Sequence, residues 1–165
     1  MNFEEIKNLL IHKFGPDSII GEENNGLQPA LIIAAEKLTE ICLELRDNSN
    51  TYFDFLSCIT AVDYGIEQKQ FGVVYHLSSI PYKNQLVLKV IQEHDRNKDD
   101  LPVFPSVSSV WRTAEWHERE AYDLMGIYFE GNEDLRRILL PEDWEGHPLR
   151  KDYKNPEYYK GIKVD

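Results

Sequence analysis

Apolar residues recur every three to four positions in two early stretches of the chain, residues 3–14 and 37–45. This spacing predicts two amphipathic helices, because it gathers the apolar side chains on one helical face. The first pattern stops at Gly15-Pro16 and the second at the polar run 47–50, and both favour a chain reversal. The apolar positions are Phe3, Ile6, Leu10 and Phe14 in the first stretch and Leu38, Ile41, Cys42 and Leu45 in the second.

Segments rich in β-branched and aromatic residues predict strands at residues 18–21, 30–33, 53–64, 71–78 and 85–91. Short loops join the last three segments, so we expect them to form an antiparallel meander. Helices followed by a block of strands are typical of an α+β fold. We therefore predict a mostly antiparallel sheet with helices packed on one face.

A third helix is predicted over residues 111–126, with Gly126 as its C-terminal stop. One stripe of this helix collects the apolar residues Trp111, Ala114, Ala121, Tyr122 and Met125. Glu118 falls in the middle of that stripe. A buried carboxylate without a partner is costly, so we expect Glu118 to pair with a cation from Arg136, Arg137 or Arg150. The alternative is that Glu118 lies at the edge of the stripe and stays hydrated.

The opposite side of this helix carries Trp116 and Leu124 together with Glu120 and Asp123. Large apolar side chains on both sides predict that the helix is covered twice, once by the sheet and once by the arm or by another protein. The alternative for Glu120 and Asp123 is a solvated face. Glu115 and Arg119 are spaced as a surface ion pair of the i, i+4 type.

The composition changes towards the C-terminus. Residues 136–163 hold seven Lys and Arg against five Asp and Glu, and Pro141, Pro148 and Pro156 interrupt them. Proline lacks an amide donor and fixes φ, so neither a long helix nor a central strand fits there. We predict an α+β domain at 1–130 and an extended aromatic arm at 131–165. Such an arm buries little within itself and must lie on its own domain or on a partner.

Composition and charge exclude several classes of protein. The 165 residues predict one domain with an appendage, and the net charge of −11 disfavours nucleic acid and direct membrane adsorption. The longest apolar run, residues 30–35, is too short to span a membrane, and the first residues lack the pattern of a secretory signal. We therefore expect a soluble, intracellular chain. Cys42 and Cys58 are too few to ligate an iron–sulfur cluster.

The search for catalytic motifs is mostly negative. The run His117-Glu118-Arg119-Glu120-Ala121 begins like a zinc-protease helix but lacks the second histidine. No glycine-rich phosphate loop and no nucleophile elbow is present in the sequence. One remote alternative remains, a stand-alone acid/base enzyme that uses His117 and Glu118 together with the neighbouring acids.

Three segments in order resemble the signature of the C subunit of NADH:quinone oxidoreductase, respiratory complex I. The segments are Trp116-His117-Glu118-Arg119-Glu120-Ala121-Tyr122-Asp123-Leu124-Met125-Gly126-Ile127, Asp134-Leu135-Arg136-Arg137-Ile138-Leu139-Leu140-Pro141 and Trp144-Glu145-Gly146-His147-Pro148-Leu149-Arg150-Lys151-Asp152-Tyr153. A weaker resemblance includes residues 60–64 and 74–77. At Asn132-Glu133 the chain departs from the family pattern, which usually has His-Pro there.

The resemblance implies a cofactor-free peripheral-arm subunit of a proton-pumping NADH:quinone oxidoreductase. Its arm would extend along the large quinone-site D subunit, with the B and I subunits nearby, and FMN, iron–sulfur clusters and quinone would be held by partner subunits. The chain would lie on the cytoplasmic side of the cell membrane, peripherally through its partners, with no transmembrane segment and no catalytic activity of its own.

The site expected from the residues and the resemblance together is an interface. Glu118, Glu120 and Asp123 would form a charged lattice with Arg136, Arg137 and Arg150, which ties the helix to the arm or to the partner. The aromatic anchors would be Trp144, Tyr153, Tyr158 and Tyr159. The alternative function is the equivalent subunit of a related membrane-bound hydrogenase or of a ferredoxin- or deazaflavin-dependent dehydrogenase.

Overall fold

The computed structural model describes residues 1–24, 26–96 and 100–163. Its helices are α1 (Phe3–Phe14), α2 (Leu38–Asp47) and α3 (Ala114–Met125), with short 3-10 turns at Pro16–Ser18 and Ala35–Lys37. Its strands are β1 (Ile19–Glu23), β2 (Ala30–Ile33), β3 (Phe55–Asp63), β4 (Gln70–Ser79), β5 (Asn84–Glu93), β6 (Val103–Pro105), β7 (Tyr128–Glu130), β8 (Tyr158–Tyr159) and β9 (Ile162–Lys163).

The predicted helices are confirmed. Both ends of α1 are defined by capping residues. At its N-terminus the Asn2 side chain accepts a hydrogen bond from the Glu5 amide (2.9 Å), and the Glu5 carboxylate accepts one from the Asn2 amide (2.8 Å). At its C-terminus Gly15 takes a φ of +90°, which favours glycine over other residues. Helix α3 begins three residues later than predicted, because residues 111–113 form a turn ahead of it.

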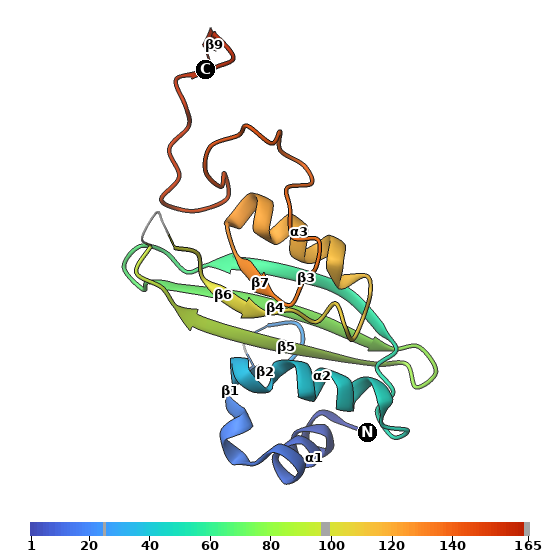
Figure 1. Ribbon diagram of the computed structural model, residues 1–165. Coiled ribbons are helices and arrows are strands. Elements are labelled where there is room, and N and C mark those ends of the chain that lie inside the picture. Colours follow the sequence, from blue (N-terminus) through green and yellow to red (C-terminus); the bar gives the residue numbers. More distant parts are fainter. Residues whose placement is uncertain (25, 97–99, 164–165) are drawn as a thin grey trace.

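Five strands form the main sheet in the order β1-β2-β5-β4-β3 (Figure 1). The meander β3-β4-β5 is antiparallel throughout, as predicted, and β1 pairs antiparallel with β2. Strand β2 pairs parallel with β5, with Ala30 opposite Val87. The chain therefore leaves β2, builds α2 and the first two strands of the meander, and returns with β5 beside β2.

The hydrophobic core lies on one face of this sheet. Alternate residues of β4 point into it, namely Phe71, Val73, Tyr75 and Leu77. These side chains belong to one buried cluster that also contains Ile6 of α1, Cys42 of α2 and Met125 of α3. The three helices thus share one face, and the predicted α+β architecture is confirmed.

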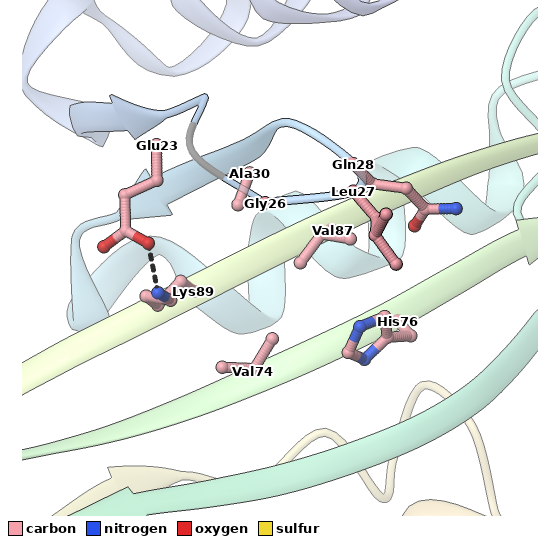
Figure 2. A pocket seen from close by; sticks show the side chains of 9 residues that line it. All are labelled: Glu23, Gly26, Leu27, Gln28, Ala30, Val74, His76, Val87 and Lys89. Carbon is pink, nitrogen blue, oxygen red and sulfur yellow. Dashed lines mark hydrogen bonds and ion pairs between the residues drawn. The ribbon is translucent and has the colours of Figure 1, made fainter.

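The other face of the sheet is open and carries a shallow hollow of about 370 Å³ (Figure 2). Its floor is largely aliphatic, with Val74 and Val87 pointing outwards beside His76. Lys89 of β5 forms an ion pair with Glu23 of β1 at its rim. Gly26, Leu27 and Gln28, which precede β2, form one wall of this hollow.

Two features beyond the meander position the C-terminal half. Strands β6 and β7 form a small parallel pair, which the sequence patterns do not predict, and they bracket α3 at both of its ends. The described part of the arm, residues 131–163, consists of turns and of the short hairpin β8-β9, in agreement with the prolines. The arm rises from the α3 side of the molecule, and its last residues project away from the body (Figure 1).

Candidate partner-binding site at helix α3 and the C-terminal arm

Glu118 of α3 is fully buried, as its place on the apolar stripe predicts. Its Oε1 accepts a hydrogen bond from the Val107 amide (2.8 Å), and its Oε2 accepts bonds from the Ser106 hydroxyl and the Asn132 side-chain amide (both 2.7 Å). Burial raises the pKa of Glu118, and these three donors oppose the rise. The carboxylate thereby fastens α3 to the segments before and after it.

The prediction that Glu118 pairs with an arginine is wrong. Its partners are uncharged groups that lie 11, 12 and 14 residues away in sequence. They reach the carboxylate because the pair β6-β7 brings the segment after β6 and the turn after β7 to the same side of α3. Hydrogen bonds from three neutral donors satisfy a buried carboxylate without a second buried charge.

Asp123 is the acid of α3 that pairs with an arginine. It is fully buried, and its Oδ1 accepts a hydrogen bond from Nη1 of Arg137 (2.7 Å). Its Oδ2 accepts bonds from three consecutive backbone amides, those of Ile138, Leu139 and Leu140, at 2.7–3.0 Å. Burial alone would raise the pKa of Asp123, but the Leu140 amide, Arg137 and the other two amides lower it. The alternative of a solvated Asp123 is thus excluded.

Arg137 extends this contact further along the arm. Its Nη2 donates to the carbonyl oxygens of Trp144 (2.9 Å) and Gly146 (3.0 Å). The ring of His147 contacts the same helix end, with Nδ1 2.9 Å from the Asp123 carbonyl oxygen. We call this arrangement, centred on Asp123 and Arg137, the inner lock. It folds residues 137–147 against the C-terminal end of α3, whereas Trp116, on the same side of that helix, stays 60% exposed.

Arg119 also turns towards the arm. Its side chain is 7% exposed and donates to the carbonyl oxygens of Arg136 (3.1 Å) and Arg137 (3.0 Å). Its acidic partner is Asp134, at 3.6 Å. The prediction of a surface pair between Glu115 and Arg119 is therefore wrong, because the arm offers Arg119 carbonyl groups at a buried place.

The remaining residues of the predicted lattice lie outside the inner lock. Glu120 is exposed, and Arg136 is a surface residue that pairs with its neighbour Asp134 (2.7 Å). Arg150 contacts none of the three α3 acids and instead binds Asp152 through two hydrogen bonds (2.9 and 3.0 Å). Of the predicted lattice, the structure contains the pair Asp123–Arg137. Glu120, Arg136 and Arg150 are not part of it.

Of the four predicted aromatic anchors, three are partly buried, namely Trp144, Tyr153 and Tyr159, and Tyr158 is exposed. The ring of Trp144 lies 5.1 Å from that of Tyr159, whose hydroxyl donates to Asp143 (3.1 Å). Tyr153 is half-buried and lies beside Gly146. Tyr158, by contrast, is 62% exposed. Further large apolar side chains stand in solvent on α3 and along the arm, namely Trp116, Leu139, Leu149 and Ile162.

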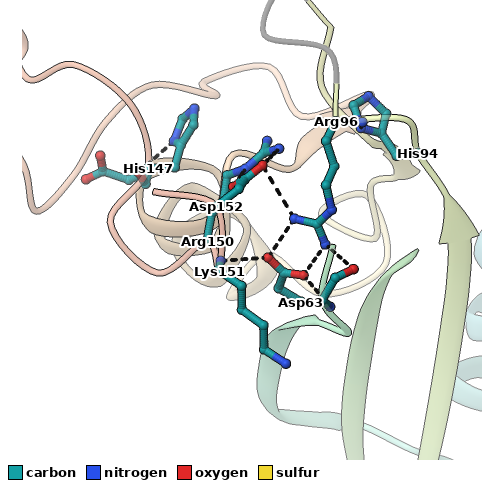
Figure 3. A network of polar contacts seen from close by, with 9 residues as sticks. Asp63, His94, Arg96, His147, Arg150, Lys151 and Asp152 are labelled. Atoms are coloured by element: carbon teal, nitrogen blue, oxygen red, sulfur yellow. Dashed lines mark hydrogen bonds and ion pairs between the residues drawn. The ribbon is translucent and has the colours of Figure 1, made fainter. Parts of the chain in front are cut away.

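A second cluster, which the sequence patterns do not predict, joins the arm to the end of β3 (Figure 3). Asp63, the last residue of β3, accepts hydrogen bonds from the guanidinium of Arg96 and from the Lys151 amide (2.8 Å). Arg96 also lies 3.5 Å from Asp152. The sequence pattern indicates only a turn at residues 63–65. Asp63 lies within one of the segments that resemble the family, and that was the one signal that pointed to it.

Glu118 is not accessible as an acid/base group. Glu118 has no exposed surface and is surrounded by its three donors, so a substrate cannot reach it. No group of three or more His, Cys, Asp or Glu side chains suited to a metal ion occurs among residues 1–24, 26–96 and 100–163. What the arrangement can do is hold an arm in place and present apolar side chains beside it.

The fold has a counterpart among solved structures. A chain in the structure of the membrane-bound sulfane sulfur reductase, an archaeal respiratory membrane complex, superposes with a TM-score of 0.72 and 25% sequence identity. The match covers 92% of this chain and 85% of that chain. The α+β domain with its attached arm thus has the architecture of a subunit of respiratory membrane complexes.

Sequence comparison makes the assignment specific. Residues 31–159 match the family of the respiratory-chain NADH dehydrogenase 30 kDa subunit. Proteins named as the C subunit of NADH-quinone oxidoreductase are 45% identical in Chloroherpeton thalassium, 44% in Chlorobium phaeobacteroides and 42% in Geobacter sulfurreducens, each over 92% of this chain. The chain belongs to this family, that of the C subunit of NADH:quinone oxidoreductase, and the resemblance seen in the sequence is confirmed.

The relatives differ in length. The chain spans 61% of the Chloroherpeton protein, but 89% of the Chlorobium protein and 92% of the Geobacter protein. Within the part of this chain that the structure describes, no helix has the length and apolar character needed to cross a bilayer. Membership of the family supports a role in a multi-subunit oxidoreductase complex.

Proposed function

We propose that this chain is a cofactor-free scaffold subunit of a proton-translocating NADH:quinone oxidoreductase. In this role it holds the large quinone-site D subunit, with the B and I subunits nearby, on the cytoplasmic side of the membrane. Electrons pass from NADH to quinone through those neighbours and the other partner subunits, which carry FMN, iron–sulfur clusters and quinone. The isolated chain catalyses no step, and its attachment to the membrane is peripheral, through its partners.

One observation carries this proposal: the arm is fixed to the body and still leaves large apolar side chains in solvent. The inner lock gives residues 137–147 a defined path. Along that path and just beyond it Leu139 and Leu149 are 62% and 58% exposed, and Tyr158 at the tip is as exposed as Leu139. Turning these side chains inwards would add to the stability of the chain on its own, so stability does not explain their exposure. Ordered, exposed apolar groups are typical of a surface that a partner covers.

The comparisons support the NADH-linked complex over the related hydrogenases and ferredoxin- or deazaflavin-dependent dehydrogenases. The curated relatives cited above, at 42–45% identity, are all named as the C subunit of NADH-quinone oxidoreductase. The chain of the sulfane sulfur reductase complex is more distant, at 25%. That likeness supports a common architecture for the wider group of complexes.

The test is capture of the complex from native membranes. The tagged full chain, expressed in cells that contain the complex, is purified from detergent-solubilised membranes, and its partners are identified by mass spectrometry. We expect the large quinone-site subunit in equal amount, with NADH:quinone activity in the captured material. Capture of a hydrogenase large subunit would favour the alternative, and capture of no redox subunit would contradict both.

Two neighbouring arginines give a matched pair of variants for this capture. Arg137 is held in the inner lock, whereas Arg136 is 68% exposed in its side chain and pairs only with Asp134 among the described residues. We expect Arg137→Ala to reduce capture at least tenfold and Arg136→Ala to leave it unchanged. Full occupancy of Arg137→Ala in a complex with reduced turnover would contradict a scaffold role for the inner lock.

A further inference from the structure

The arm has a second attachment to the body that is independent of the inner lock. Asp63 at the end of β3 is 2% exposed in its side chain and binds two segments at once. Its Oδ2 accepts hydrogen bonds from Nη1 of Arg96 (3.0 Å) and from the amide of Lys151 (2.8 Å), which lies 88 residues away in sequence. Its Oδ1 accepts one from the Gly65 amide (2.8 Å). One carboxylate thus closes the sheet end and holds the arm.

Charges and one aromatic ring complete this attachment. The guanidinium groups of Arg96 and Arg150 both lie over the buried ring of Phe71, at 4.6 and 5.1 Å from its centre. Asp152 joins them, because it binds Arg150 through both oxygens and lies 3.5 Å from Arg96. The two cations and two anions form one alternating chain, Asp63–Arg96–Asp152–Arg150, so the cluster is neutral, and it is largely buried. Figure 3 shows the arm residues converging on Asp63 and Arg96. We call this cluster the outer lock.

The outer lock is the last point at which the arm is bonded to the body. Beyond Asp152, the hydrogen bonds and ion pairs of the described residues stay within the arm, as between Tyr159 and Asp143 or Lys160 and Asp143 (3.4 Å). The inner and outer locks share no side chain. The outer lock at residues 150–152 therefore sets where the tip, residues 154–163, leaves the body, and Tyr159 and Lys160 of the tip then fold back onto Asp143 of the arm.

We propose that the Asp63–Arg96 pair is a positioning site for the C-terminal tip. It fixes where the tip leaves the body, so that Tyr158 and the exposed residues beside it are already oriented when the partner binds. This inference rests on the proposed function only in that the tip contacts a partner. The lock itself belongs to the free chain. Asp63 and Arg96 act on the tip through the arm.

Hydrogen exchange in the full chain tests the two locks separately. In Asp63→Ala we expect the amides of residues 150–153 to exchange at least tenfold faster, with residues 138–140 unchanged. Asp123→Ala is the matched variant: it should speed exchange at residues 138–140 and leave residues 150–153 unchanged. Because Asp63 is buried and its loss could unfold the sheet end, Arg150→Gln provides a second variant that alters only the arm side of the outer lock, with a smaller effect on the same amides.

A distance measurement between two spin labels reports the orientation of the tip directly. Spin labels at the native Cys58 on the outer sheet face and at Glu157→Cys report the distance from body to tip; Cys42 is fully buried and stays unlabelled. We expect one narrow distribution in the otherwise unaltered chain and a broad one in the Asp63→Ala and Arg150→Gln chains. Unchanged exchange at residues 150–153, or an equally narrow distance distribution in both variants, would overturn the inference.

Partner capture separates this inference from the proposed function. If the unaltered chain shows a narrow distribution but captures no redox subunit, the outer lock stands and the proposed function fails. If the unaltered chain captures the complex and Asp63→Ala, still folded, does so equally well, the tip does not need to be aimed and the inference fails. We expect Asp63→Ala to lower capture at least fivefold and Asp54→Ala, an exposed acid before β3, to leave it unchanged.

Discussion

At the scale of single residues, two acids of one helix satisfy burial in different ways. Glu118 accepts hydrogen bonds from three uncharged donors, whereas Asp123 combines three backbone amides with an arginine. The difference follows from what each faces. Glu118 faces Ser106 and Val107 of the body and Asn132 at the start of the arm, all of them uncharged donors, and Asp123 faces the part of the arm that carries Arg137. Both acids act as fasteners between segments distant in sequence.

Removing the Glu118 carboxylate should be costly. We expect Glu118→Ala to lower the free energy of unfolding by about 2–4 kcal/mol, because it leaves donors of Ser106, Val107 and Asn132 buried without an acceptor. Urea unfolding followed by circular dichroism measures the loss. Glu120→Ala, two positions along on the exposed side, is the control and should change stability by less than about 0.5 kcal/mol. Equal effects of the two variants would contradict the role given to Glu118.

Gly126 offers a second test at a single position. It has a φ of +68°, and an added Cβ would lie 2.4 Å from Cδ2 of His147. We expect Gly126→Ala to cost about 2–4 kcal/mol through backbone strain and displacement of that ring. Gly15, with a φ of +90° and nothing within 4 Å of its added Cβ, isolates the backbone contribution. Thermal unfolding should therefore place Gly126→Ala clearly below Gly15→Ala, and similar melting temperatures would rule out the contact with His147.

At the scale of elements, the helices and the meander could be predicted because their signals are local. Periodic apolar residues define α1, α2 and the buried stripe of α3, and that stripe correctly placed Glu118 in the interior. The partners of Glu118 could not be predicted, because they depend on the three-residue strands β6 and β7, whose pairing is parallel and non-local. The same pattern correctly predicts that Asp123 lies on the side of α3 opposite the apolar stripe. A helical pattern alone does not say what covers that side.

The junction between β3 and the arm has a predictable response to acid. Burial would raise the pKa of Asp63, but Arg96 and the Lys151 and Gly65 amides lower it to about 2. Because this value lies below that of the unfolded chain, the stabilisation is complete above about pH 4 and is lost as the pH falls from about 4 to 2. It amounts to about 2 kcal/mol.

Comparison with Asp63→Asn reveals this contribution. The difference in unfolding free energy between the unaltered chain and the variant should shrink by about 2 kcal/mol between pH 5 and pH 2, because the variant lacks the titrating carboxylate. Chemical unfolding at a series of pH values gives the difference. A difference that stays constant across this range would show that Asp63 is not ionised in the fold.

At the scale of the whole molecule, the arm contributes unequally to stability along its length. Residues 137–152 are bonded to the body through the two locks, and residues 154–163 are bonded only within the arm. A chain that ends at Tyr153 should therefore unfold within about 0.5 kcal/mol of the full chain, as expected for loss of a segment that forms no bond to the body.

A chain that ends at Gly131 is the matched comparison. It lacks Asn132, Arg137 and the amides that Asp123 binds, so two buried carboxylates lose partners at once. We expect a loss of at least about 4 kcal/mol or failure to fold. Differential scanning calorimetry of the two truncated chains checks this, and equal stability would mean that the arm is dispensable for the body.

The parallel pairing of β2 with β5 has a consequence for how this chain is made. The strand of Ala30 gains a neighbour on that side only once Val87 has been made, and the ribosome must first add the 56 residues between them. At 5–20 residues per second the delay is roughly 3–11 s. During that interval the nascent chain carries an apolar strand with one unpaired edge. Chaperones that recognise such segments are therefore needed most before translation reaches the third strand of the meander.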